Sequence, residues 1–283
     1  MATNYHDRIQ RVHAAIHANP AADHALDELA DIAALSRFHF HRVYTAMTGE
    51  TVAEAVRRIR LGRAAQALRR GSAPVAQIGR DHGYANAGSF SRAFRAAFGV
   101  TPSRFRAQPE DHAVPAYLAF TQGDPTMYPV QITTEPARHV IGVRHIGPYP
   151  QMGRSFQTLS GGLFKSDLWP QVQAMLAVYL DDPAVVDAQK LRGLAAVAVA
   201  PGTVPPPGFE SHDLDGGRHA VMRVTGPYCG LSAAYDWLYG AWLAQSGVTP
   251  RDGPCYELYV NNPGETPPQD LVTDVYLPLH DED

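Results

Sequence analysis

Apolar positions follow two different periods along the chain, and the change of period divides it into two parts. Up to about residue 108, apolar residues recur every three or four positions, which is typical of amphipathic helices. From Tyr128 onward they alternate with polar residues, which predicts β-strands. Two longer stretches, at about 150–165 and 229–246, interrupt the strands and are predicted to be helices. We therefore predict a multi-domain chain, with an all-α domain followed by an α+β domain.

The helical part contains an internal repeat at a shift of 50 residues: SRFHFHRVYTAMTGET (36–51) matches NAGSFSRAFRAAFGVT (86–101). One helical face is apolar in each copy, formed by Phe40, Val43, Tyr44 and Met47 in the first and by Phe90, Ala93, Phe94 and Phe98 in the second. Ser36 and Asn86 are predicted N-caps, and Gly49 and Gly99 end the helices. A shorter apolar helix precedes each copy. The pattern predicts two helix-turn-helix units.

The other face of each repeated helix is a candidate DNA-reading surface. It carries Arg37, Phe38, His41 and Arg42 in the first unit, and Asn86, Ser91, Arg92 and Arg95 in the second. Side chains near the start of such a helix reach base edges in the major groove, and arginine can bond guanine O6 and N7 together. The alternative is a solvated face with local ion pairs. The segment 52–70 predicts a long helix that would fix the spacing of the units.

The charge distribution changes sign between the two parts. Residues 1–110 hold 15 Arg and no Lys against 9 acidic residues, a net charge of +6, whereas residues 111–283 have a net charge of −10. A basic segment joined to an acidic one favours a polyanion-binding part and a part that avoids the polyanion. Double-stranded DNA is therefore the expected partner of the first part.

Residues 26–106 resemble the DNA-binding domain of AraC-type transcription regulators. The resemblance is carried by SRFHFHRVYTAMTGETVAEAVRRIRLGRAA and VAQIGRDHGYANAGSFSRAFRAAFGVTPSRFR. It implies base contacts at Phe38, His41, Arg42, Ala87, Gly88, Ser91 and Arg92. Ala87 and Gly88 depart from the polar residues often found there, so the second unit is expected to read fewer bases or to read DNA shape. RNA polymerase is a candidate further partner.

The second part also contains a repeat, in which RHVIGVRHIGPY (138–149) matches RHAVMRVTGPY (218–228). Each copy predicts a strand, a Gly-Pro-Tyr turn, a helix and two further strands. Two such units can place their strands in one sheet with both helices on one face. A cleft between the copies would then be a natural site for a small-molecule effector.

This part, over roughly 128–280, resembles the gyrase-inhibitor-like effector-binding domain of drug-responsive regulators. The GPY turns, YLDDP (179–183), KLRG (190–193), YELYVNNP (256–263) and DVYLPL (274–279) carry the resemblance. It implies ligand binding between the repeats, with a buried acid among aromatic residues, and Glu257 matches that acid. The fold also occurs in hydrolases, so fold alone does not settle activity.

Glu257 is unusual on physical grounds as well. It lies within the apolar strand CYELYVN, whereas the matching strand at 174–181 has no acid in its middle. A buried carboxylate must be paired, hydrogen-bonded or protonated. A cationic, partly aromatic ligand would supply the partner charge, so the expected effector is lipophilic or cationic. The faces of candidate aromatic residues would hold the cation, namely Tyr149, Trp169, Tyr228 and Tyr259. The alternatives are that Glu257 faces water or pairs with Arg138 or Arg218.

No metal or cofactor is indicated by the sequence. His139 and His219 are duplicated inside strands without a second ligand at metal spacing, and the two cysteines suggest no zinc site. No Walker, GxSxG or HExxH pattern occurs. The N-terminus lacks a signal peptide's apolar region, and no apolar run is long enough to span a membrane. We expect a cytoplasmic chain without a membrane partner.

Three functional hypotheses follow. The first is a sequence-specific transcription regulator with a DNA-binding domain at 1–108, a linker at 109–127 and an effector-binding domain at 128–283. The second is a hydrolase that uses Glu257 as a general base. The third is an interaction module whose cleft is filled by its own side chains.

Overall fold

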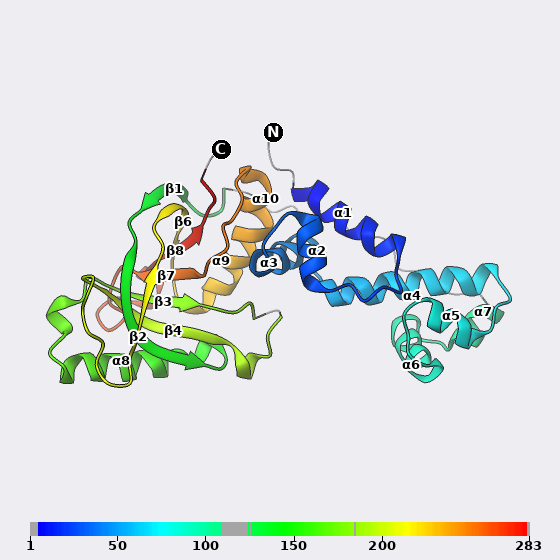
Figure 1. Ribbon diagram of the computed structural model, residues 1–283, viewed down its shortest axis with the longest axis horizontal. Helices are drawn as coiled ribbons and strands as arrows, with labels where there is room; N and C mark the ends of the chain where they lie inside the picture. Colours follow the sequence, from blue (N-terminus) through cyan, green and yellow to red (C-terminus); the bar gives the residue numbers. More distant parts are fainter. Residues whose placement is uncertain (1–4, 109–123, 125, 184, 282–283) are drawn as a thin grey trace.

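The computed structural model describes residues 5–108, 124, 126–183 and 185–281. A helical region, residues 5–107, is followed by an α+β domain with a curled sheet (Figure 1), which confirms the predicted fold class. The predicted linker, 109–127, lies outside the described residues except for 124, 126 and 127.

The helical region forms two helix-turn-helix units joined by a long helix, α4 (Figure 1). The first unit consists of α1 (Tyr5–Ala18), α2 (Leu26–Ala33) and α3 (Arg37–Thr48). After α4 (Val52–Arg70), the second unit consists of α5 (Val75–Asp81), α6 (Ala87–Phe98) and α7 (Pro102–Ala107). With 19 residues, α4 is about 28 Å long. It begins with a capping box between Thr51 and Glu54.

The predicted ends of the two repeated helices are confirmed. The Ser36 and Asn86 side chains accept hydrogen bonds from the backbone N–H groups of His39 and Ser89. Gly49 and Gly99 follow the helices with φ of 73° and 76°, a backbone conformation that favours glycine. Each helix therefore begins and ends where its own sequence specifies.

The second domain is built on an eight-stranded sheet in the order β1-β6-β8-β7-β3-β4-β2-β5, with antiparallel pairing throughout. The repeat generates a pseudo-twofold arrangement in which β3 and β7 meet at the centre. The strand that precedes each copy pairs with the other copy, so that β1 extends the second copy and β5 extends the first. The strands are β1 (Val130–Glu135), β2 (Arg138–Ile146), β3 (Ala174–Tyr179), β4 (Arg192–Val199), β5 (Glu210–Leu214), β6 (Gly217–Thr225), β7 (Cys255–Tyr259) and β8 (Val272–Pro278).

The predicted helices of both copies cover the same face of the sheet. In the first copy this helix is α8 (Gly153–Lys165), whose Leu159 and Leu163 pack on β2, β3 and β4. In the second copy it is one continuous helix with a π-helical turn in its middle, comprising α9 (Leu231–Trp237), η6 (Leu238–Trp242) and α10 (Leu243–Ser246). The short 3₁₀ turns are η2 (Tyr149–Gln151), η3 (Trp169–Gln171), η4 (Ala188–Lys190), η5 (Tyr228–Gly230) and η7 (Pro268–Asp270).

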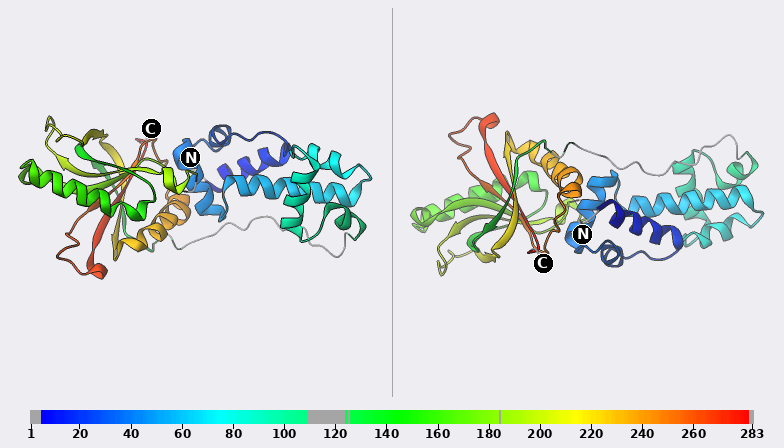
Figure 2. Two further views of the ribbon diagram at one scale, coloured as in Figure 1. Left: turned by 90° about the horizontal axis from the view of Figure 1, so that it is seen from below. Right: turned by 90° about the horizontal axis from the view of Figure 1, so that it is seen from above.

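The hydrophobic core of the first unit continues into the second domain. Phe40, Val43 and Tyr44 of α3 belong to the same buried cluster as Leu238 and Tyr239 of η6. The views of Figure 2 place α3 beside the helix of the second copy. The second unit instead has a core of its own, around Phe90 and Phe94. The two units therefore differ in what they pack against.

Candidate functional site

Glu257 lies at the centre of the sheet, where the two copies meet. Glu257 stands opposite Ala177 of β3 and is only 2% exposed. Its Oε2 accepts hydrogen bonds from the hydroxyls of Tyr179, at 2.8 Å, and Tyr259, at 3.0 Å. The small Ala177 side chain at the matching position of the first copy leaves room for the larger acid. The acid therefore lies in the seam between the repeats.

Neither alternative for Glu257 holds. The side chain does not face water, and its hydrogen bonds are made by tyrosines. Arg138 pairs with Glu135 at 2.9 Å, and Arg218 donates to the backbone oxygen of His280. The curled sheet instead brings two tyrosine hydroxyls to the carboxylate, which is therefore hydrogen-bonded where it is buried.

Aromatic side chains from both copies surround this carboxylate. The Tyr179 ring contacts Tyr149 at 4.7 Å and Tyr235 at 6.3 Å between ring centroids. Tyr259 contacts Tyr228 at 5.2 Å and Phe156 at 5.5 Å. Three of the four predicted aromatic residues are therefore brought to Glu257, namely Tyr149, Tyr228 and Tyr259.

Trp169 is the predicted aromatic residue that the structure does not bring to the site. It begins η3, is 47% exposed, and precedes the end of β3 opposite to Tyr179. Among the described ring contacts, none joins it to the cluster. Sequence reasoning missed Tyr179 and Tyr235. The signal for Tyr179 was present, because YLDDP matches YVNNP in the repeat and places it at the position equivalent to Tyr259.

The electrostatics of the site follow from burial. Burial raises the pKa of Glu257, while the hydroxyls of Tyr179 and Tyr259 and the charge of Arg42 act in the opposite direction. Burial, followed by the neighbouring Glu257 charge, raises the pKa of Tyr179 well above its usual range. The tyrosines therefore remain protonated and donate hydrogen bonds. These bonds let the site hold the Glu257 carboxylate without an ion pair to a basic side chain.

The candidate DNA-reading residues of the second unit are accessible. Arg92 and Arg95 of α6 are exposed, Ser91 is half-buried, and Asn86 is exposed while capping the helix. Arg57 and Arg104 are also exposed, whereas Arg58 pairs with Glu50 at 2.8 Å. The second unit therefore presents a basic surface that could contact DNA in this conformation.

The first unit is different, because its predicted reading face is covered. The His41 side chain is 5% exposed and that of Arg42 is 11% exposed, and both face Asp182 of the second domain. Phe38 is half-buried beside Arg42, and Arg37 is exposed and pairs with Asp27 at 3.3 Å. The prediction that this whole face meets solvent or DNA does not hold in this conformation, since the second domain occupies it.

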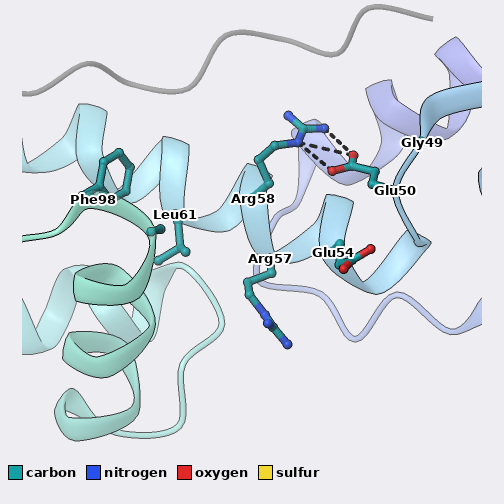
Figure 3. Close-up of a pocket in the computed structure, with 8 residues that line it drawn as sticks. Gly49, Glu50, Glu54, Arg57, Arg58, Leu61 and Phe98 are labelled. Atoms are coloured by element: carbon teal, nitrogen blue, oxygen red, sulfur yellow. Dashed lines mark hydrogen bonds and ion pairs between the residues drawn. The ribbon is translucent and has the colours of Figure 1, made fainter. Parts of the chain in front are cut away.

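Two hollows occur away from Glu257. One, of about 360 Å³, lies in the helical region and is lined by Glu50, Glu54, Arg57, Arg58, Leu61 and Phe98, together with Gly49 and Ala97. Figure 3 shows that Arg58 faces Glu50 while Arg57 points away from both. The other, of about 240 Å³, lies between the domains and is lined by Phe38, Leu180, Asp252, Gly253 and Pro254.

Comparison with known proteins agrees with this architecture. Residues 128–280 match the family of the GyrI-like small molecule binding domain, and residues 29–108 match a helix-turn-helix domain family. The chain belongs to the GyrI-like family. It is an AraC-type DNA-binding transcription regulator with a GyrI-like effector-binding domain.

Individual relatives cover one part or the other. The chain is 32% identical to a DNA gyrase inhibitor of Serratia proteamaculans over 47% of its own length and 87% of that protein. It is 30% identical to the right origin-binding protein of Escherichia coli K12 over 42% of its length and 41% of that protein. A crystal structure of a hydrolase from Listeria innocua is similar at 11% identity and a TM-score of 0.41, over 53% of this chain and 91% of that one.

None of the helices in the described ranges combines the length and the apolar character that crossing a membrane requires.

Proposed function

We propose that this regulator reads a specific DNA sequence through α3 and α6, and that its effector domain senses a lipophilic aromatic cation at Glu257. The observation that supports a cationic ligand is the buried carboxylate of Glu257, which is enclosed by tyrosines. Hydroxyl donors stabilise the ionised carboxylate but bring no positive charge. A cation would supply that charge, and the faces of the aromatic rings would favour it further.

On the DNA side, we propose that Arg37, Asn86, Ser91, Arg92 and Arg95 contact DNA directly. Phe38, His41 and Arg42 would contact bases only after α3 leaves the second domain, because His41 is buried there and the Arg42 side chain is only 11% exposed. Residues 1–108 would bind DNA, and residues 128–283 would bind the effector.

The cation is tested by calorimetric titration with tetraphenylphosphonium. We expect Glu257→Gln to weaken its binding at least tenfold, because the substitution keeps the shape of the side chain and removes its charge. Glu265→Gln, which removes an exposed carboxylate, is the matched control and should bind normally. Neutral triphenylphosphine oxide should bind weakly to all three proteins. Equal affinity for the cation in wild type and Glu257→Gln would refute the ligand class.

The same titration has a predicted pH dependence. Because the pKa of Glu257 is raised, its ionised form is lost at a higher pH than that of an ordinary glutamate. Cation affinity should be constant above this raised pKa and fall up to tenfold per pH unit below it. Affinity that does not change down to pH 4 would exclude Glu257 as the counter-charge.

DNA binding is tested with duplexes selected by the full chain from a randomised pool. Binding of a selected duplex should weaken steeply between 50 and 200 mM salt, because counterions are released from the phosphates. A scrambled duplex should bind more weakly at every salt concentration. Equal binding of both duplexes would leave DNA affinity without sequence specificity.

The hydrolase hypothesis has one observation in its favour, the raised pKa of Glu257, since a general base works best with a pKa near the operating pH. However, Oε2 already accepts hydrogen bonds from two tyrosines and is shielded from water. Turnover of p-nitrophenyl acetate that disappears in Glu257→Gln, and not in Glu265→Gln, would favour the enzyme. Stoichiometric cation binding without product would favour the sensor.

A further inference from the structure

The outer face of α3 lies against the second domain, and Arg42 is at the centre of the contact. Its guanidinium carbon lies 5.7 Å from the centre of the Tyr235 ring and 5.6 Å from that of Tyr239, and 4.8 Å from Phe38 on its own helix. Tyr235 in turn contacts Tyr179, which donates to Glu257. A positive charge is thus already held by the aromatic residues that surround the effector site.

Polar contacts fix this arginine in place. Its Nη2 donates to the backbone oxygen of Asp181 at 3.2 Å, and its Nε lies 3.9 Å from the carboxylate of Asp182. His41 Nδ1 lies 3.4 Å from the other oxygen of Asp182. Tyr149 of the effector site hydrogen bonds to the same Asp181 oxygen, at 2.8 Å. The second copy has Asn261 and Asn262 at the positions of these acids, so only the first copy offers this anchor.

The surrounding surfaces are closely fitted. A Cβ atom added at Gly240 of η6 would lie 2.7 Å from the backbone oxygen of Ala46 in α3, so only glycine allows this approach. His39 Nε2 donates to the backbone oxygen of Arg251 at 2.7 Å, which leaves Nδ1 to accept from the hydroxyl of Tyr239 at 3.2 Å. Tyr239 belongs to the π-helical turn, a feature that often occurs at functional sites.

The hollow beside this contact is small. Phe38 lines it and also contacts Arg42, but its volume is about 240 Å³. Pockets for drug-sized ligands usually have 300–1,000 Å³. The hollow is therefore too small for a large aromatic cation unless Phe38 and Arg42 move.

We propose that α3 is an internal ligand of the effector domain, with Arg42 in place of an external cation. Binding of a lipophilic cation and docking of α3 then exclude each other, and the cation releases the first DNA-reading helix. This inference rests on the proposed function, because it assumes that the tyrosines around Glu257 are where the cation binds.

The proposal makes DNA and cation binding reciprocal. A ligand shifts a conformational equilibrium only if it binds the two states unequally. Here the cation binds the undocked state, and DNA that contacts α3 binds the same state. Each should therefore strengthen the other by the same factor, and couplings of this kind are about 5- to 150-fold.

The experiment that tests this inference removes the anchor outside the DNA-reading helix. In wild type, saturating tetraphenylphosphonium should raise the affinity for a selected duplex about 5- to 150-fold. Asp182→Asn and Gly240→Ala should bind the duplex with the higher affinity before any cation is added. Asp270→Asn removes an equal charge from an exposed position and should behave as wild type. Unchanged DNA affinity in both variants, with cation binding intact, would overturn the inference and leave the proposed function standing.

Discussion

The helices α3 and α6 are copies of one sequence pattern, yet one is covered and the other is exposed. Both begin at a side-chain cap, both end at a glycine with positive φ, and both bury two aromatic residues on the inner face. Arg42 of α3 is held by the second domain, whereas the matching Arg92 of α6 is exposed. The difference shows that a repeat specifies the inner face of a helix more strictly than it specifies what covers the outer face.

The residues on the outer faces account for this difference. Where α3 has Phe38, His39 and His41, α6 has Gly88, Ser89 and Ser91. Aromatic and imidazole side chains supply apolar area and a hydrogen-bond acceptor that another domain can bury. Glycine and serine supply little of either. Of the two copies, α3 is therefore the one with an outer face suited to docking.

The largest expected difference between the two units lies in their cores. Phe40 and Phe90 are both fully buried, so replacing either by alanine should destabilise its core by about 3–5 kcal/mol. Phe90→Ala should unfold the second unit alone, because its core does not include the effector domain. Phe40→Ala should lower the melting temperature of the main unfolding transition, because its core is shared with the effector domain. Calorimetry should resolve the two outcomes, and Phe164→Ala, at an 81% exposed site, should change neither transition.

The next difference concerns DNA. Without cation, Arg92→Ala should weaken binding of a selected duplex by about 1–3 kcal/mol, because Arg92 is accessible. Arg42→Ala should not weaken it, because the arginine is covered by the second domain beside Asp182 and its loss also loosens the docked state. With saturating tetraphenylphosphonium both variants should bind more weakly than wild type. Equal losses without cation, measured by fluorescence anisotropy, would show that the two helices read DNA equally.

A smaller difference is expected from pH, and it should affect only the first unit. Burial lowers the pKa of His39 to about 3, while the matching residue in α6 is Ser89. Tyr239, Arg251, Arg42, Asp182 and His280 are the groups around it. His39 can take up a proton below the ordinary histidine pKa of about 6.5 only when α3 is undocked, so docking is at full strength above that pH. Below it, docking should weaken by up to about 1.4 kcal/mol for each pH unit.

This pH dependence can be assigned by substitution. DNA affinity without cation should rise between pH 7 and pH 5.5 as docking weakens. His39→Gln should lose the dependence, and His41→Gln, beside Asp182, should keep it. A dependence that survives in His39→Gln would point to another group.

The smallest difference is expected at the helix caps. Asn86 Oδ1 accepts from the Ser89 N–H at 2.8 Å, and Ser36 Oγ accepts from the His39 N–H at 3.4 Å. Asn86→Ala should destabilise the second unit by about 1 kcal/mol. Ser36→Ala should cost about half as much, because its bond is longer and tertiary contacts hold α3. Thermal unfolding followed by circular dichroism would measure both, and a larger loss for Ser36→Ala would contradict this ranking.

Most of the fold could be predicted because the period of the apolar residues is a local property. The periods of both domains, the repeats, and the caps at Ser36 and Asn86 were all visible in the sequence. The strand β5, ESHDL, was not predicted, because its residues are mostly polar and exposed. It forms by pairing with β2 at the edge of the sheet. Its residues lack the apolar alternation that marked the other strands, β1 included.

The candidate site was partly predictable for a related reason. Glu257 stood out by its apolar surroundings and by the repeat, and Tyr149, Tyr228 and Tyr259 lay near predicted turns or on the same strand. Tyr179 and Tyr235 became neighbours of Glu257 only through strand pairing and the packing of α9 on the sheet. Trp169 looked equivalent in the sequence but lies at the other end of β3.

By itself, the sequence determined the two periods, the two repeats and the identity of the residues that face each local core, because caps, turns and apolar spacing act over a few residues. Only the tertiary structure decided that Arg42 lies against Asp182 and the tyrosines of the effector domain while Arg92 does not. These partners are about 140 to 200 residues apart in the chain. Their contact depends on how two separately specified surfaces fit, which no local pattern encodes.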